Sequence, residues 1–322
     1  MQEIFDVVVV GGGPAGLSAA LVLGRSRLRV ALVDEGVPRN APAREMHNYL
    51  GRDGIRPLDL LKAGRREVAR YGVVFHPGVA TAAHREKHGF RVELAGGTRL
   101  RCRRLLLATG VVDPLPEIEG LEALYGTSVH HCPFCDGWEH RDERIAVYGR
   151  GAAAVRFAVK MTRWSPDVVL LTGGPSRLRT SDRELLEQMA IPLRSEVVER
   201  LEGSKGRLRR VVFAQGEPLD RDTLFFGSHP KQRCDLAAAL GCRFTHKGMV
   251  HANHLQETGV PGLYVAGDAS RDVQLAIVAA AEGTKAGVGI VADLERERLA
   301  TAARIRRSAP GRAVAPAARL GK

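Results

Sequence analysis

A short apolar strand followed at once by closely spaced glycines constrains the fold of this chain more than any other feature. Residues 5–10 read FDVVVV, a β-branched run typical of a strand buried on both faces of a parallel sheet. Residues 15–24 then read as a helix of small residues, and residues 29–34 are a second apolar strand that ends in an acid. The turn after the first strand has the pattern G-x-G-x-x-G, made by Gly11, Gly13 and Gly16. This order predicts a β-α-β unit that binds a dinucleotide.

Each glycine of this turn has a physical role in such a unit. Gly11 permits the tight turn, Gly13 lets the backbone approach a pyrophosphate, and Gly16 lets the helix pack closely on the strand. The start of the helix offers unpaired N–H groups and a positive dipole end to the pyrophosphate. Asp34, 18 residues after Gly16, is placed to accept hydrogen bonds from an adenosine ribose. Further cofactor contacts are predicted from Pro14, Ala15, Glu35 and Ala80.

The same supersecondary structure occurs a second time. An apolar strand begins at Arg144, a helix follows to about Arg163, and residues 167–172 form the next strand. The turn between the first strand and the helix keeps the small residues Gly149, Gly151 and Ala154. Two such units predict an α/β fold with two Rossmann-like dinucleotide-binding domains, each of three layers.

A C-x-x-C pair, Cys132 and Cys135, is the reactive candidate. Such a pair closes a small disulfide, and at a helix start the lowered pKa of a thiol makes thiolate available to attack a substrate disulfide. Asp136, beside the second cysteine, is placed to shuttle the proton that a leaving thiolate needs. A zinc site would need a second pair of ligands at regular spacing, so we expect no metal. Two inert thiols remain the alternative.

A late strand indicates which dinucleotide binds. The run GLYVAGD at 262–268 ends in Gly267 and Asp268, with Gln274 shortly after, and an earlier strand ends in an ATG turn that contains Thr109 and Gly110. In flavoproteins with two dinucleotide domains, the aspartate of such a late segment binds the ribityl-phosphate region of FAD. The sequence therefore predicts bound FAD.

In the order and spacing of these motifs, the chain resembles the low-molecular-weight thioredoxin reductase family over about residues 4–293. The resemblance implies that Cys135 lies nearest the flavin, that Cys132 attacks the substrate disulfide and that Asp136 is the acid/base. It also implies a homodimer, a rotation between the two domains, and a thioredoxin-like protein or a small disulfide as substrate. Asn48 resembles the asparagine that contacts the flavin in this family.

Departures from the family pattern leave the electron donor open. The family binds NADPH at the second turn with a His-Arg-Arg cluster, where this chain has Thr172, Gly173 and Gly174. NAD(P)H is therefore one candidate donor, and ferredoxin or another protein is the other. His131 replaces an aromatic residue common in the family and is predicted to serve as a base or to cap the helix.

The stretch CPFCDGWE also resembles the CPYCHGWE of dithiol oxidases, which close a disulfide in a small natural product and pass electrons to oxygen. Asp136 stands where those oxidases have His, which favours the reductase direction. We therefore expect an FAD-dependent disulfide reductase of the thioredoxin reductase type. A dithiol oxidase is the first alternative, and a flavin-binding sensor without turnover is the second.

Composition bounds the domain organisation. With 44% apolar and 26% charged residues, the composition is close to the average of soluble globular proteins, which excludes a disordered or fibrous protein. The 322 residues are enough for two domains. We expect an FAD-binding domain of residues 1–113 and 245–297, interrupted by an inserted domain of residues 114–244 that carries the C-x-x-C pair. Residues 298–322, rich in Ala, Arg and Pro, are expected to form a basic tail that is frayed or disordered in isolation.

The net charge of +12 raises nucleic acid as a partner, but its distribution argues otherwise. Seven basic residues and no acid fall in the last 25 positions, which leaves +5 on residues 1–297. Aromatic residues make up only 5% of the chain, so we expect no nucleic-acid groove, and the charge would suit an acidic protein donor. The sequence contains no run of 18 apolar residues, so we expect no membrane span. The five unevenly spaced cysteines and the N-terminal pattern predict a cytoplasmic protein.

Overall fold

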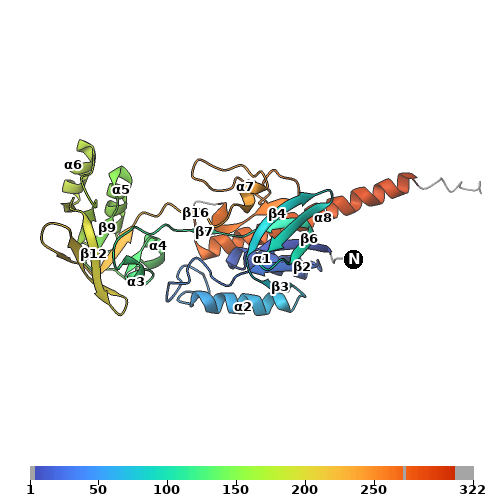
Figure 1. The fold of residues 1–322 in the computed structure, drawn as a ribbon, viewed down its shortest axis with the longest axis horizontal. Coiled ribbons are helices and arrows are strands. Elements are labelled where there is room, and N and C mark those ends of the chain that lie inside the picture. Colours follow the sequence, from blue (N-terminus) through green and yellow to red (C-terminus); the bar gives the residue numbers. More distant parts are fainter. Residues whose placement is uncertain (1–3, 271–272, 309–322) are drawn as a thin grey trace, which may run out of the picture.

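The computed structural model describes residues 4–270 and 273–308. The chain forms two lobes that lie side by side, joined by two extended connections (Figure 1). These connections pair with each other as an antiparallel ladder of β7 (Val111–Val112) and β16 (Lys231–Gln232). The α/β class with two Rossmann-like domains is confirmed.

The first lobe is built on a seven-stranded sheet. Its parallel strands, in spatial order, are β3 (Val74–Pro77), β2 (Val30–Asp34), β1 (Ile4–Val10) and β6 (Arg99–Leu107), with β17 (Leu263–Val265) also paired to β6. The antiparallel strands β5 (Gly89–Leu94) and β4 (Ala80–Glu86) continue the sheet from β6. Strands β1 and β6, which lie at the centre, read as continuous apolar runs at their C-terminal ends because both of their faces are covered.

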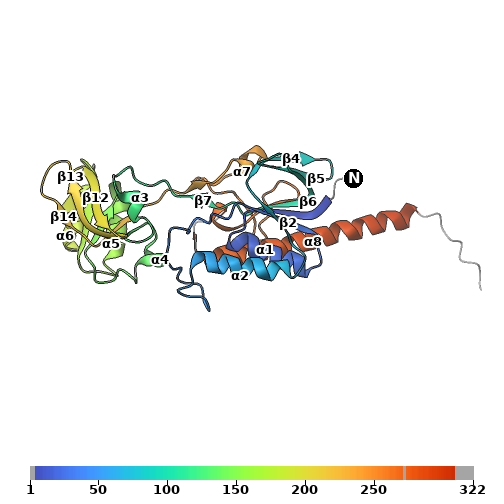
Figure 2. The same ribbon diagram turned by 60° about the horizontal axis from the view of Figure 1, so that its bottom comes forward.

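Alternation along β1 divides the core of this lobe into two layers. Val7 and Val9 pack with the helices α1 (Pro14–Arg25), α2 (Pro57–Ala69) and α8 (Ala276–Ser308). Val8 and Val10 point to the opposite face and pack with β4, β5 and the short helix α7 (Leu236–Ala239). The result is three layers, with the parallel strands in the middle (Figure 2).

The second lobe repeats this arrangement. Its parallel sheet runs in the order β11 (Leu193–Arg194), β10 (Val168–Leu171), β9 (Ile145–Tyr148), β15 (Thr223–Phe226) and β8 (Val129–His130). Helices α5 (Gly151–Met161) and α6 (Thr180–Gln188) cover one face. The other face carries α3 (Leu121–Leu124) and an antiparallel sheet of β12 (Val198–Ser204), β13 (Arg207–Phe213) and β14 (Leu219–Asp220). The C-x-x-C segment lies on α4 (Pro133–Asp136), directly after β8.

The chain returns to the first lobe earlier than the sequence predicts. Leu236, Ala237 and Cys242 lie in the core of the first sheet, together with residues of β1 and β5, although the expected inserted domain extends to residue 244. Burial of these apolar side chains ties α7 to the first lobe. We therefore propose the β7–β16 ladder as the boundary on both connections.

Helix α8 corrects the prediction of a basic tail that starts at residue 298. The helix continues through Ser308 and projects beyond the first lobe (Figure 1). Alanine, leucine and arginine are strong helix formers, and Arg298 pairs with Glu295 one turn earlier at 2.6 Å, so the helix needs no packed face there. Residues 309–322 of the predicted tail lie outside the described residues. No helix in the described part of the chain is long and apolar enough to cross a bilayer.

Candidate active site

One cavity of about 380 Å³ brings together most of the residues that the sequence predicts to be functional. From the predicted cofactor contacts it is lined by Gly11, Gly13, Pro14, Ala15, Asp34, Glu35, Ala80, Thr109, Gly110, Gly267, Asp268 and Gln274. From the predicted catalytic group it is lined by His131, Cys132, Cys135 and Asp136. Apart from Ala80, which begins the antiparallel strand β4, the first set lies at or after the C-terminal ends of parallel strands of the first lobe, where ligands bind in folds of this kind. The second set comes from the other lobe.

The first glycine turn has the geometry that its sequence predicts. A Cβ on Gly16 would lie 1.8 Å from the carbonyl oxygen of Gly11, so only glycine lets the helix approach this closely. A Cβ on Gly11, whose φ is +105°, would lie 2.2 Å from the carbonyl oxygen of Ala108. In contrast, a Cβ on Gly13 would meet no atom of the described residues within 4 Å. The first two positions therefore serve packing, and Gly13 faces open space beside the cavity.

Asp34, at the end of β2, is held from two directions. Its Oδ1 accepts a hydrogen bond from the backbone N–H of Gly12 at 3.0 Å, and its Oδ2 pairs with Arg65 of α2. Arg65 is 31 positions away in the chain, and no motif in the sequence connects the two residues.

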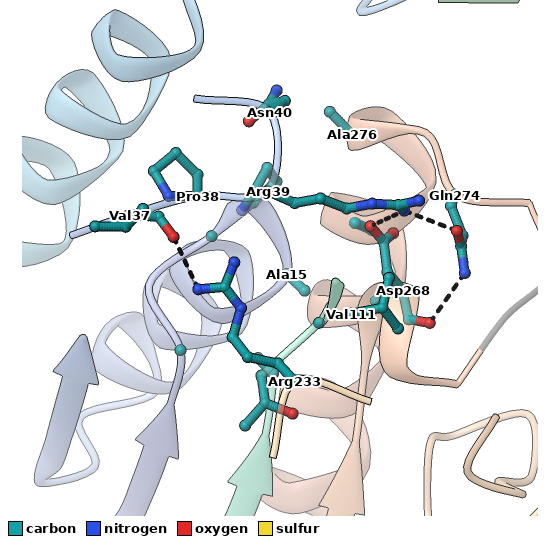
Figure 3. Close-up of a pocket in the computed structure, with 18 of the residues that line it drawn as sticks. Ala15, Val37, Pro38, Arg39, Asn40, Val111, Arg233, Asp268, Gln274 and Ala276 are labelled. Atoms are coloured by element: carbon teal, nitrogen blue, oxygen red, sulfur yellow. Dashed lines mark hydrogen bonds and ion pairs between the residues drawn. The ribbon is translucent and has the colours of Figure 1, made fainter. Parts of the chain in front are cut away.

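Arg39 is a central residue of the cavity that the sequence analysis does not predict. Its guanidinium donates to Asp268 at 2.9 Å and to Gln274 at 2.7 Å (Figure 3). It also forms two hydrogen bonds of 2.6 Å with Asp113, the residue that follows β7. Burial raises the pKa of Asp268, although the charge of Arg39 opposes this shift. The loop that carries Arg39 has no pattern that would mark it as functional.

A second arginine, Arg233, enters the cavity from the returning connection. Its Nη1 donates to the carbonyl of Val37 at 3.1 Å (Figure 3). The same nitrogen donates to the Glu35 carboxylate at 2.6 Å. Arg233 and Arg39 thus bring two cationic groups to a cavity that the glycine turn also lines.

Cys132 and Cys135 form a disulfide with their Cα atoms 5.3 Å apart. Cys132 is the residue that caps α4, and its Sγ accepts a hydrogen bond from the backbone N–H of Cys135 at 3.2 Å. The prediction that His131 caps this helix is therefore wrong, because the cap lies one residue later.

His131 instead belongs to a polar group between the lobes. Its Nδ1 lies 2.9 Å from the hydroxyl of Tyr125, and its Nε2 lies 3.8 Å from Asp113. Burial lowers the pKa of His131, although the carboxylate of Asp113 opposes the shift. Burial alone would raise the pKa of Asp113, but hydrogen bonds from Arg39 and Ser228 and the positive charges nearby hold it below its usual value.

Asp136 lies on α4 immediately after Cys135 and lines the same cavity. Its Oδ1 is 3.2 Å from Nδ1 of His130, the last residue of β8. The only sequence signal for His130 is that two histidines precede the C-x-x-C pair.

Comparison with known proteins identifies the family. Residues 5–283 match the model of the pyridine nucleotide-disulphide oxidoreductases. The chain belongs to this family. The thioredoxin reductase aclD of Aspergillus oryzae is 30% identical to it over 90% of this chain and 96% of its own length. The thioredoxin reductase sirT of Leptosphaeria maculans is 30% identical over 89% of this chain and 94% of its own. The crystal structure of HlmI is 38% identical, covers 95% of this chain and 98% of its own, and superimposes with a TM-score of 0.92.

These findings make the chain a flavin-dependent, thioredoxin reductase-type oxidoreductase that acts on a disulfide, as predicted. The family implies FAD and usually NADPH. Within residues 4–270 and 273–308, no three His, Cys, Asp or Glu side chains are grouped to hold a metal ion.

Asn48, whose contact with the flavin stays a prediction, lies against the C-x-x-C segment in this structure. It does not line the cavity, and its side-chain amide donates to the carbonyl oxygen of Phe134, between the two cysteines, at 2.6 Å. The neighbouring His47 lies 3.4 Å from Glu139 of the second lobe. In this arrangement of the lobes, the loop that contains Asn48 holds the C-x-x-C segment.

The second glycine turn of the oxidoreductase lies apart from this cavity. Gly149, Gly151 and Ala154 all belong to the second lobe, and none of them lines it. Arg150, within the turn, donates to the carbonyl oxygens of Thr172 at 2.9 Å and of Gly173. Its side chain thus lies against the end of β10, at the position where a nucleotide-binding unit holds the ribose.

Proposed function

We propose that this protein is an FAD-dependent disulfide oxidoreductase that works through Cys132 and Cys135. The observation that carries the proposal is that the disulfide opens into the same cavity as the first glycine turn and Asp268. A redox-active disulfide needs access both to a flavin and to a substrate, and this cavity lies between the two lobes.

The cavity fits FAD by the chemistry of its lining. Gly13 leaves open space for a pyrophosphate, Arg39 and Arg233 supply positive charge, and the carboxylates of Asp34 and Asp268 can accept hydrogen bonds from hydroxyl groups. When bound, FAD supplies or accepts the two electrons that the cysteine pair exchanges.

The cysteine pair then performs thiol–disulfide exchange with a thioredoxin-like protein or a small disulfide. Cys132 gives its proton to Asp136 as its sulfur attacks one sulfur of the substrate. This attack forms a mixed disulfide and releases a thiolate, which takes the proton back from Asp136. Cys135 then attacks the sulfur of Cys132, which closes the Cys132–Cys135 disulfide and releases the second substrate thiolate. The backbone N–H of Cys135 points at the sulfur of Cys132 and would stabilise its thiolate.

Cysteine variants test this assignment. Cys132→Ser and Cys135→Ser should each abolish turnover, assayed as reduction of a small disulfide or oxidation of a dithiol, while the purified protein keeps its flavin absorbance. If either variant keeps full activity, the pair does not carry the reaction.

We further propose a cytoplasmic homodimer, which light scattering of the purified protein and cell fractionation would check.

A donor other than NAD(P)H, as in a dithiol oxidase or a reductase fed by another protein, is the second candidate. It is favoured by Arg150, whose guanidinium lies at the strand end where a nicotinamide cofactor would place its ribose. The test mixes the oxidised protein anaerobically with NADPH, NADH, reduced ferredoxin or dithiothreitol and follows bleaching of the flavin. Rapid bleaching by NADPH would rule out this candidate, whereas bleaching by the dithiol alone would favour the oxidase.

A further inference from the structure

His130 is a buried histidine that the exchange described above does not use. It ends β8, two residues before Cys132, and its residue surface is only 5% exposed. Its Nδ1 lies 3.2 Å from Oδ1 of Asp136. Its Nε2 is buried and has no hydrogen-bond partner among the residues that the structure describes. Only one of the two ring nitrogens therefore has a polar neighbour, and that neighbour is the proposed acid/base.

Packing alone does not account for a histidine at this position. The ring of His130 lies 5.4 Å from that of Phe225 and 4.7 Å from that of His140, measured between ring centroids. An apolar side chain would fill such a site without a buried nitrogen that lacks a partner, which costs free energy. The contact with Asp136 is the feature that an apolar residue could not replace.

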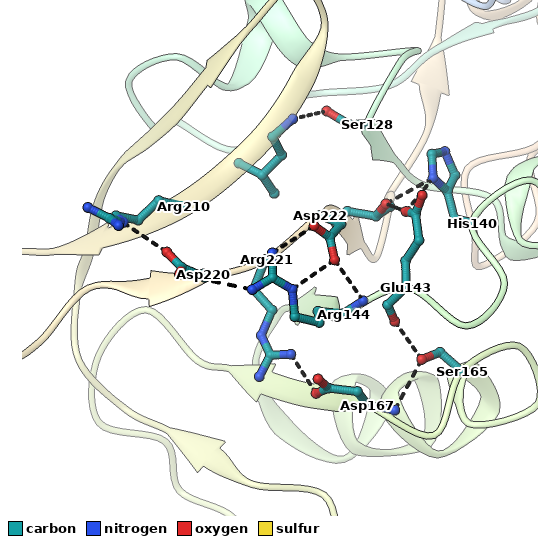
Figure 4. A network of polar contacts seen from close by, with 12 residues as sticks. Ser128, His140, Glu143, Arg144, Ser165, Asp167, Arg210, Asp220, Arg221 and Asp222 are labelled. Carbon is teal, nitrogen blue, oxygen red and sulfur yellow. Dashed lines mark hydrogen bonds and ion pairs between the residues drawn. The ribbon is translucent and has the colours of Figure 1, made fainter.

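A second polar group lies behind His130. His140 Nδ1 is 2.8 Å from a carboxylate oxygen of Glu143 and 2.9 Å from the hydroxyl of Thr223 (Figure 4). Burial would raise the pKa of Glu143, but its hydrogen bonds with His140 and Thr223 hold that pKa below its usual value. Glu143 therefore stays a carboxylate. Thr223 and Phe225 belong to β15, which pairs with β8. The ring that packs against His130 is thus itself held in place.

We propose that His130 is a positioning residue for Asp136: by holding Oδ1 it keeps the other carboxylate oxygen free to exchange a proton with the cysteine sulfurs. This proposal rests on the proposed function. Asp136 takes the proton of Cys132 as its sulfur attacks and returns that proton to the first substrate thiolate. It then does the same for Cys135 and the second thiolate. Two electrons pass from the cysteine pair to the substrate disulfide, and Asp136 ends in its starting state.

The charged surroundings of His130 are compatible with this role. Asp136 faces it from α4, His140 and Glu143 lie on the loop after α4, and His131 follows it in the chain. Beyond His131 lie Asp113 and Arg39, which pair with each other. On β15 the neighbour of His130 is the uncharged Phe225.

The test compares two substitutions of His130 in the flavin-loaded protein. His130→Asn keeps an N–H donor near the position of Nδ1, whereas His130→Leu removes it. The protein is mixed anaerobically with dithiothreitol, and flavin bleaching is followed between about pH 6 and pH 9, on both sides of the ordinary thiol value of about 8.5. We expect His130→Leu to slow bleaching by about 10- to 100-fold, as for the loss of a hydrogen bond to a charged group, and His130→Asn to restore most of the rate.

Two further comparisons separate positioning from a structural role. In an Asp136→Asn background, His130→Leu should cause little additional loss, and in the wild-type background it should shift the pH profile, which His130→Asn leaves in place. His84→Leu is the matched control, since His84 also faces a carboxylate, Glu93 at 3.9 Å, but lies on β4. It should bleach at the wild-type rate. If His130→Leu does not fold, His130→Gln, which moves the donor to the Nε2 position, replaces it with the same expected loss.

The proposal is overturned if removal of the donor leaves the rate unchanged, if the Asn variant is as slow as the Leu variant, or if the loss adds fully to that of Asp136→Asn. Each of these results would leave the proposed function intact. Failure of the proposed function has a different signature, which is a Cys132→Ser or Asp136→Asn variant that still bleaches at the wild-type rate.

Discussion

The two β-α-β units share strand order and small-residue spacing but differ at the residue between the first two glycines. In the first unit this residue is Gly12, whose N–H donates to Asp34 at the end of the next strand. In the second unit it is Arg150, whose guanidinium donates to the carbonyls at the end of β10, where no acid is present. The first unit lines the cavity that holds the disulfide, and the second supports the segment that carries it.

This difference separates the requirements of the fold from those of binding. Both units keep the close helix–strand approach, which depends on Gly16 in one and Ala154 in the other. A contact of the NAD type with the ribose also needs an acid at the end of the next strand, and only the first unit has one there, Asp34. The close packing of helix on strand therefore depends neither on the residue between the first two glycines nor on an acid at the strand end.

The largest effect is expected where the helix approaches the strand in the first unit. Gly16→Ala places a Cβ 1.8 Å from a backbone oxygen, so we expect loss of bound flavin and destabilisation of about 3 kcal/mol, the upper range for overpacking. Flavin absorbance of the purified protein and thermal unfolding measure both. The reverse change at the matched position, Ala154→Gly, should cost about 1 kcal/mol and leave flavin binding unchanged. Full flavin content in Gly16→Ala would contradict this account.

The next effect concerns the connection between the two units. Asp113→Asn removes the negative charge that pairs with Arg39, from a side chain that is only 3% exposed. Arg39 keeps Asp268 as a partner. We expect a loss of about 2 to 3 kcal/mol at pH 7, somewhat below the usual cost of breaking a buried ion pair. Unfolding by urea measures it.

The pH dependence of that loss follows from the sign of the shift. Because the pKa of Asp113 is lowered in the fold, its contribution is fully present well above the ordinary carboxyl value of about 3.9 and is lost as the pH falls through and below that value. The wild type and Asp113→Asn should therefore converge in stability below about pH 4. A difference that stays constant down to pH 3 would show that the ionised carboxylate is not what stabilises this connection.

A smaller effect is expected at the turn of the second unit. Arg150→Ala removes two hydrogen bonds to backbone carbonyls and clears the strand end, at a cost of about 1 kcal/mol in stability. Bleaching of the flavin by NADPH or NADH should rise by about tenfold, equivalent to one hydrogen bond of improved binding, while bleaching by dithiothreitol stays the same. Unchanged rates with both nucleotides would mean that Arg150 does not block nucleotide binding at the second unit.

The smallest effect is expected at the exposed edge of the second unit. Arg144 pairs with Asp222 at 2.8 Å, but their side chains are 45% and 38% exposed (Figure 4). Solvent screens such pairs, so Arg144→Ala should cost less than about 1 kcal/mol, and the cost should fall in high salt. The comparable change in the first lobe is Arg103→Ala, which removes a 2.9 Å pair with Asp6 and a 3.4 Å pair with Glu297 and should behave alike. A loss of more than about 2 kcal/mol in the free energy of unfolding at either position would show that these exposed pairs contribute substantially to stability.

Local patterns made much of the fold and part of the site predictable. The strands around each glycine turn follow from apolar runs. That Cys132 and Cys135 lie close enough to form a disulfide follows from their separation of three residues. The extension of α8 to Ser308 is not apparent from hydrophobic periodicity, because its last turns have no apolar face and depend on the helix propensity of alanine and arginine. The contact of Asn48 with Phe134 was also missed, since it joins residues 86 positions apart.

The two β-α-β units, the open first turn and a cysteine pair able to close can be read from the sequence alone, because each depends on residues near one another in the chain. Three further features are visible only in the folded molecule. The disulfide opens into the cavity of the first unit, Arg39 joins Asp113 to Asp268, and Arg150 lies at the strand end of the second unit. These features depend on how side chains from distant segments pack and pair, and a linear pattern carries no record of that.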